Sequence, residues 1–134
     1  MTTPIIISKE TPYEDACKLN GAAPMTLADF EKFPENQRQY MLSVHRVVTV
    51  IEAQKQDRLF DWNDDDQDKY SPWWDMETYG EAEPGSGFAY YVYGCATTYT
   101  GVGARLSNFS TEETKFIAEV MFEDYKVIMK DQGK

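Results

Sequence analysis

The chain has few of the residues that build metal and thiol sites. Its 134 residues include one histidine, His45, and two cysteines, Cys17 and Cys95, which lie far apart and form no Cys-x-x-Cys pair. Zinc sites take four ligands, mostly from cysteine and histidine, so the sequence argues against a zinc site. In a cytosolic protein two such cysteines are expected to remain free thiols.

Long apolar runs and basic residues are scarce as well. The longest apolar run near the start is residues 5–7, with no basic residue before it. We therefore expect neither a secretory signal nor a membrane span, and a protein that stays in the cytoplasm where it is made. The 13 basic residues against 23 acidic ones give a net charge of −10. This charge argues against a direct nucleic-acid partner and against anionic membranes, because both bind proteins through Lys and Arg.

The chain does contain enough apolar residues for a core. Hydrophobic residues make up 42% of it and aromatic residues 14%. Disordered chains lack such aromatic content, and this length is common for one domain. We therefore expect residues 1–134 to form a single domain, with residues 1–10 extended or flexible.

Two short helical segments are predicted near the start. Thr11, Pro12 and Glu14 have the pattern of a helix entry with a capping box, and Gly21 after Asn20 is a typical helix end. A second short turn is expected to begin at Thr26, with its own acidic residue three positions on.

The strongest helical pattern runs from Pro34 to about Gln56. Its apolar residues recur with the spacing of an amphipathic helix, and the opposite face is polar. The stripe consists of Tyr40, Met41, Val44, Val47, Val48 and Ile51.

A last helix is predicted from the capping box at residues 110–113 to about Lys130. Asp124 falls near the middle of its apolar face. A carboxylate there is either a buried acid with a partner or a sign that the face is open at its end. The face consists of Phe116, Ile117, Val120, Met121, Val127 and Ile128.

The composition changes to aromatic and β-branched residues at residues 88–93, and Gly94 is expected to end that strand. Further strands are predicted at residues 96–100 and 102–109. The sequence therefore predicts an α+β fold in which two long helices pack on one face of a small antiparallel sheet of two or three strands.

The segment at residues 57–87 shows no periodicity, and we expect it to be irregular. Residues 57–83 contain ten acidic residues and two basic ones, and the segment holds all three tryptophans. Long irregular segments in compact domains are often functional. Its aromatic residues indicate that it packs onto the body, across an edge of the sheet, instead of trailing as a linker.

Part of this acidic segment resembles a calcium loop. Asp61, Asn63 and Asp65 have the alternate spacing of the first ligands of such a loop. The rest of the pattern is missing, because Asp66 stands where glycine is needed and Pro72 where a bidentate glutamate is needed. We expect a solvated acidic turn and no metal; these three residues are the set that a cation would use.

The aromatic residues of the segment allow two interpretations. Trp73, Trp74 and Tyr79 could line a stacking surface for a saccharide or a nucleotide, or anchor a protein interface. They could equally pin the irregular segment to the body as part of the core, which is the interpretation we favour for most of them.

No catalytic constellation stands out. His45 would have to work with Cys17, Cys95 or a serine, and nothing isolates a carboxylate pair in an apolar pocket. We expect no cofactor and no enzymatic activity, with an enzyme of unidentified class as an alternative.

Several motifs occur in a characteristic order: Asp61-Trp62-Asn63, Lys69-Tyr70, Pro72-Trp73-Trp74, Gly103-Ala104-Arg105-Leu106 and Tyr125-Lys126. This order resembles small uncharacterised proteins of Bacteroidetes bacteriophages and prophages, over about three-quarters of the chain. The chain departs from the pattern in its more acidic residues 64–66, in Trp74 where Phe is common, and in Asp124. The resemblance implies a phage-associated setting and transfers no site residues.

These observations favour a non-catalytic protein that binds another protein through its acidic, aromatic segment. The partner would be a host factor or a second copy, in the host cytoplasm or in the virion. The alternative is a module that binds a small ligand. The candidate binding residues are Asp61, Asp64, Asp65, Asp66, Trp73, Trp74 and Tyr79.

Overall fold

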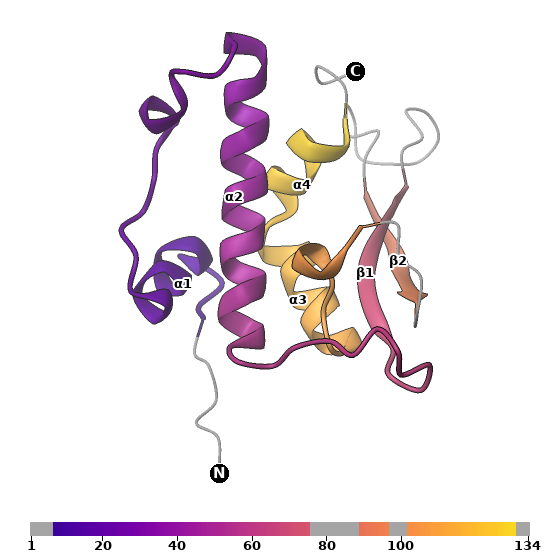
Figure 1. Cartoon of the computed structure of the whole chain (residues 1–134). Helices are drawn as coiled ribbons and strands as arrows, with labels where there is room; N and C mark the ends of the chain where they lie inside the picture. The colour runs from indigo at the N-terminus through magenta and orange to yellow at the C-terminus, as the bar shows by residue number, and fades with distance from the viewer. Residues whose placement is uncertain (1–6, 76–88, 97–101, 131–134) are drawn as a thin grey trace.

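The computed structural model describes residues 7–75, 89–96 and 102–130. They form four α-helices and an antiparallel two-stranded sheet, so the α+β class is confirmed. Figure 1 shows the layers: α1 lies on one side of α2, α3 and α4 lie on the other, and the sheet covers the far side of α3 and α4. The long helix α2 is therefore separated from the sheet by a layer of helices, whereas the sequence analysis placed both long helices on the sheet.

Helix α1 spans Pro12–Asn20, as predicted. Pro12 takes the first turn, and Gly21 ends the helix in the left-handed conformation, with φ 70° and ψ 31°. The predicted capping box is wrong, because the Thr11 side chain does not cap the helix. Its hydroxyl instead donates to Asp15 Oδ1 at 3.2 Å.

Helix α2 spans Glu35–Lys55 and is 21 residues long. The short turn before it, η1, is a 3₁₀ helix at Leu27–Phe30. The predicted apolar stripe is only partly buried: Val47 and Ile51 are fully buried, whereas Tyr40 is 44% exposed. The difference arises because α2 packs against α1 on one side and α4 on the other, so it buries more than one stripe. No helix in the described part of the chain is long and apolar enough to cross a membrane.

The predicted last helix is two helices. Helix α3 spans Thr111–Val120 and α4 spans Phe122–Met129, with a break at Met121, where φ is −111° and ψ is 25°. Ser110 caps α3 as predicted, since its Oγ accepts a hydrogen bond from Glu113 N at 3.1 Å. Neither proline nor glycine stands at the break, so we attribute it to the packing of α4 on α2.

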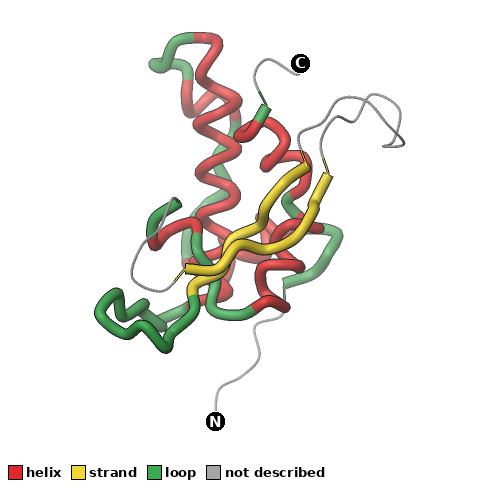
Figure 2. The backbone as a smooth tube through the Cα atoms, turned by 90° about the vertical axis from the view of Figure 1, so that its right-hand side faces the viewer, coloured by secondary structure: helices red, strands yellow, loops and turns green. Residues whose placement is uncertain are grey.

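The sheet contains a strand that the sequence analysis missed. Strand β1, Lys69–Asp75, lies inside the segment predicted to be irregular and pairs antiparallel with β2, Ala89–Ala96 (Figure 2). Strand β2 also continues through Gly94, which was expected to end it. The register shifts between Trp73 and Trp74, so one residue of β2 forms a bulge. A strand whose partner lies about 20 residues away leaves little local signal.

The strand predicted at residues 102–109 is wrong. Residues Ala104–Leu106 form a second 3₁₀ helix, η2, and Asn108 makes a single bridge to Tyr70 of β1. Residues 97–100 of the other predicted strand, and Phe88, lie outside the described residues.

The core forms where α1, α2, α3 and α4 meet, and Asp124 lies at its border. The Asp124 carboxylate accepts hydrogen bonds from Ser43 Oγ at 2.9 Å and from Arg46 Nε at 3.0 and 3.1 Å. Of the two interpretations of this acid, the buried and partnered one is confirmed. The core side chains are Tyr13, Ala16, Cys17, Val47, Val50, Ile51, Ala53, Ile117, Met121 and Tyr125.

We expect Asp124→Ala to lower the free energy of unfolding by about 2–3 kcal/mol, because it leaves the Arg46 guanidinium partly buried without its counter-charge. This value lies at the lower end of the range for buried pairs, since the Arg46 side chain is 29% exposed and partly screened by water. Glu123→Ala, at the exposed neighbouring position, is the control and should change stability by about 0.5 kcal/mol or less. Urea unfolding measures both, and equal effects would contradict a stabilising role of the pair.

Candidate functional site

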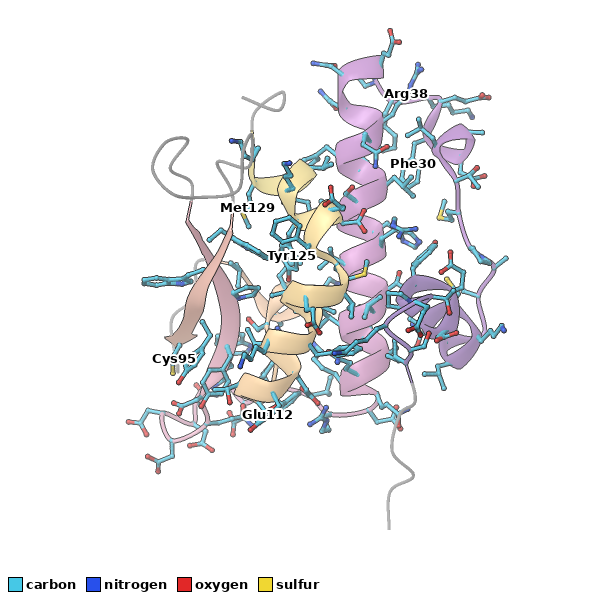
Figure 3. The ribbon with its side chains drawn as sticks, turned by 180° about the vertical axis from the view of Figure 1, so that it is seen from behind. Phe30, Arg38, Cys95, Glu112, Tyr125 and Met129 are labelled. Carbon is cyan, nitrogen blue, oxygen red and sulfur yellow. The ribbon has the colours of Figure 1, made fainter. Side chains whose placement is uncertain are left out.

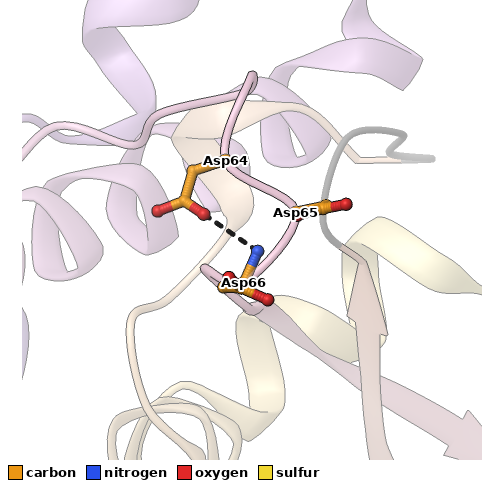
Figure 4. A group of neighbouring side chains, drawn as sticks. All are labelled: Asp64, Asp65 and Asp66. Atoms are coloured by element: carbon orange, nitrogen blue, oxygen red, sulfur yellow. Dashed lines mark hydrogen bonds between the residues drawn. The ribbon is translucent and has the colours of Figure 1, made fainter.

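The acidic turn, residues 57–68, carries six aspartates, and all of them are exposed. Its backbone is folded by its own side chains: Asp61 Oδ1 accepts from Asn63 N at 2.9 Å, and Asp64 Oδ1 accepts from Asp66 N at 2.9 Å (Figure 4). The solvated turn with satisfied backbone amides that the sequence predicted is therefore confirmed.

A buried ammonium group holds this turn from the inside. Lys69 is only 2% exposed. Its Nζ donates to the carbonyl oxygens of Asp61 at 2.7 Å and Asp64 at 3.3 Å, and it lies 5.0 Å from the centre of the Trp62 ring. Because these carbonyl oxygens hydrogen-bond the ammonium group from inside the turn, the carboxylates face outward.

The turn is also fixed to the body of the protein. The Phe60 ring stacks on Phe109, with 4.2 Å between ring centres. Arg58 Nη2 donates to Glu113 Oε2 at 2.7 Å, and the guanidinium group lies 4.5 Å above the Phe109 ring. These contacts join residues 57–68 to α3 and to the segment that precedes it.

The carboxylates that the turn brings together differ from the predicted cation set. Asp64, Asp65 and Asp66 have carboxylate oxygens within 4.8 Å of one another. Asp61 and Asp64 each use an oxygen on a backbone amide, and all three clustered residues are exposed. Exposed acidic clusters are ordinary in such turns, and we assign no metal to this one.

The two adjacent tryptophans have different surroundings. Trp73 is 59% exposed and lies across Gly94 of β2, where a Cβ atom would come within 2.6 Å of Trp73 Cε2. Trp74 packs on Phe122 and Tyr125 of α4, with 5.9 and 4.9 Å between ring centres. The strand alternation therefore separates them, and they do not form one stacking platform. Tyr79 lies outside the described residues.

Two further aromatic residues connect the acidic turn to the sheet. Tyr70 donates from its hydroxyl to Asp68 Oδ2 at 3.2 Å and meets Tyr93 edge to face, with 5.3 Å between ring centres. Tyr93 is 41% exposed. Trp73 points to the opposite face of the hairpin, because it alternates with Tyr70 along β1 and lies across Gly94. We call the remaining set the acidic–aromatic surface: the exposed Asp61, Asp64, Asp65, Asp66 and Asp68, the half-buried Tyr70, and Tyr93.

Sequence reasoning gave no role to Tyr93 or to Lys69 alone, and it placed Tyr70 among the aromatic residues near the tryptophans without its partner Tyr93. The sequence did offer one signal for Lys69: it is one of only two basic residues in a long acidic segment, so partners for its ammonium group could be expected within that segment. The contact between Tyr70 and Tyr93 could not be predicted without β1, because only the pairing of β1 with β2 brings the two rings together.

The single histidine does not meet a thiol in the described structure. His45 Nε2 lies 2.9 Å from the hydroxyl of Tyr13, which also accepts from Met25 N at 2.8 Å. Cys17 is buried on α1, whereas Cys95 is exposed on β2, on the side away from the helices (Figure 3). The thiol–histidine pair that an enzyme of this kind would need is not formed.

We expect Trp74→Ala to cost about 2–4 kcal/mol of stability and Trp73→Ala less than about 1 kcal/mol. The reason is that Trp74 contacts the aromatic residues of α4, whereas more than half of Trp73 is exposed. Urea unfolding of the two variants is a matched comparison, since the same side chain is removed at adjacent positions. A larger loss at Trp73 would mean that the exposed ring is a core element.

The stability of the protein should depend on the protonation of His45. Burial, together with the neighbouring charge of Arg46, lowers the pKa of His45 below its ordinary value of 6.5, and Glu52 acts weakly in the opposite direction. The unfolded chain therefore takes up the proton first, and the stability that neutral His45 contributes is complete above about pH 6.5 and is lost as the pH falls below it. Urea unfolding between pH 7 and 5 should give a slope of less than one proton for this residue.

His45→Gln is the control for this slope, because glutamine can still hydrogen-bond to Tyr13 and does not titrate. The variant should show a smaller slope over the same interval. An unchanged slope would mean that other groups cause the pH dependence.

Comparison with known proteins adds no relative to this picture. No protein-family model, curated protein or solved structure matches the chain. Any functional conclusion therefore depends on the acidic–aromatic surface itself.

Proposed function

We propose that this chain is a non-catalytic binding protein that engages a basic protein partner through the acidic–aromatic surface. The observation that carries the proposal is an acidic turn, fixed to the body, that presents six exposed aspartates beside exposed aromatic side chains. Such a surface offers both long-range attraction and short-range anchors to a positively charged partner.

The electrostatic part of the proposal rests on where the basic residues of the turn are. Arg58 forms an ion pair with Glu113 of α3, and Lys69 is buried beneath the backbone of the turn. Among the described residues, neither cation forms an ion pair with Asp64, Asp65 or Asp66, whose carboxylates are exposed. Closely spaced carboxylates make the local electrostatic potential strongly negative. This potential speeds the encounter with a cationic surface and makes the association sensitive to salt.

The aromatic part supplies the contact. Tyr93 is 41% exposed and meets Tyr70, which donates to Asp68. Trp73, 59% exposed, offers a further ring on the other face of the hairpin. Tryptophan and tyrosine are the residues that most often dominate binding energy at interfaces, because they bury a large area with few rotatable bonds. Their preorganised rings would lose little side-chain entropy on binding.

The setting of this function follows from the resemblance to phage and prophage proteins. In that setting the partner is a basic host protein, such as one whose own ligand is nucleic acid, and the chain acts in the host cytoplasm. A place in the virion is the alternative setting, and there the partner is another virion protein.

The test is a pull-down of the tagged chain from a Bacteroidetes lysate at about 50 mM and about 500 mM salt. The variant Asp64→Asn, Asp65→Asn, Asp66→Asn removes three charges and keeps the turn, because asparagine Oδ1 can accept the same backbone hydrogen bond. We expect a stoichiometric basic partner at low salt, lost at high salt and in the variant. The control, Glu10→Gln, Glu31→Gln, Glu123→Gln, removes the same charge from exposed sites elsewhere and should retain the partner.

Equal loss of the partner in both triple variants would show that net charge, and not the turn, causes binding. No partner at low salt would contradict the proposal. Binding of a saccharide or nucleotide that quenches the fluorescence of Trp73 would instead favour the small-ligand module.

A further inference from the structure

Strand β2 has an edge without a partner strand in the described part of the chain. The sheet has the order β1–β2, and β1 is the strand that pairs with β2 there. The sequence of Ala89–Ala96 contains no charged residue and no proline. Natural proteins protect exposed strand edges with such residues, and an unprotected edge is a template for pairing with another chain.

The opposite edge of the sheet, on β1, is protected. Tyr70 exchanges two backbone hydrogen bonds with Asn108, of 2.9 and 2.7 Å, on the side of β1 away from β2. Backbone groups of residues two apart point to the same edge, so Pro72 places its nitrogen, which carries no hydrogen, on that side as well. Within the described ranges, the contrast leaves β2 as the edge that has no partner strand.

The register identifies which backbone groups β2 offers. Tyr70 faces Cys95 and Pro72 faces Tyr93. Because Tyr70 directs its N–H and C=O away from β2, these are the non-hydrogen-bonded pairs of the ladder, so Tyr93 and Cys95 direct theirs away from β1. Tyr93 and Cys95, on either side of Gly94, therefore present their backbone N–H and C=O groups at the outer edge of β2.

We propose that β2 pairs antiparallel with β2 of a second copy of this chain, with Gly94 on the two-fold axis. In this register Tyr93 of each copy lies opposite Cys95 of the other, and each such pair exchanges two hydrogen bonds. The two hairpins then form one four-stranded sheet.

Charge favours this occupant and this orientation. The acidic turn leads into Lys69, which pairs with Ala96, so the turn lies at the Ala96 end of β2. Antiparallel pairing puts the two acidic turns at opposite ends of the sheet, separated by more than the roughly 8 Å over which charges interact at physiological salt. Parallel pairing would put both turns at the same end of the sheet and closer to each other. A second copy thus adds an uncharged strand to an uncharged edge while the like charges stay apart.

The first measurement is sedimentation of the full chain from about 1 to about 200 µM. The monomer has a mass of 15.4 kDa, and we expect a shift to twice that mass. Cys95→Pro removes the outward N–H and no hydrogen bond to β1, so it should weaken the dimer by about tenfold or more. Cys95→Ala, which keeps the N–H, is the matched control and should sediment as the original chain does.

A second measurement needs no change in β2. In a Cys17→Ala background only Cys95 can react, and the register places the two Cys95 residues diagonally across the strand pair, about 7–8 Å apart on one face. A short bismaleimide should therefore link the two copies. A monomer at all concentrations, an equal mass for the Pro and Ala variants when both are folded by circular dichroism, or the absence of a cross-link in a dimer would each overturn the proposal.

This inference does not depend on the proposed function. The Asp64→Asn, Asp65→Asn, Asp66→Asn variant, which should lose the basic partner, should dimerise at least as well as the original chain, because the repulsion between copies is smaller. Loss of dimerisation in that variant would contradict edge pairing.

Discussion

Arg46 joins three helices, and the arrangement of the other elements depends on it. Its guanidinium group hydrogen-bonds to Asp124 of α4 and lies 4.6 Å above the ring of Tyr13 in α1. A charge at the border of a core requires a counter-charge with good geometry, so it fixes the relative positions of the helices more narrowly than apolar contacts do. With α4 held in this way, Tyr125 meets Trp74, and the sheet has a surface on which to pack.

A second internal cation has a similar effect at the candidate site. The ammonium group of Lys69 is held by carbonyl oxygens of the acidic turn, at the point where β1 begins. The same residue therefore starts the strand and closes the turn. As a consequence the acidic carboxylates lie beside Tyr70 and Tyr93 of the sheet, and both proposals concern parts of the molecule whose positions are set by β1.

Several elements could be predicted because their signals are local. Pro12 and Gly21 bound α1, Ser110 caps α3, and the apolar repeat of α2 gave its extent to within a residue. Strand β1 could not be predicted, because its pairing residues are distant in sequence and its composition resembles that of a loop. The break at Met121 could not be predicted either, because neither proline nor glycine stands there and we attribute the break to the packing of α4 on α2.

The sequence by itself determined the α+β composition, the acidic character of residues 57–68 and the exposure of their aspartates, since charged side chains in an Asx-rich turn stay in water whatever surrounds them. The tertiary structure alone decided which of the two adjacent tryptophans is more exposed, which groups pair with Asp124 and Lys69, and which strand edge has no partner strand among the described residues. These properties depend on contacts between residues far apart in the chain, and neither spacing nor composition encodes those contacts.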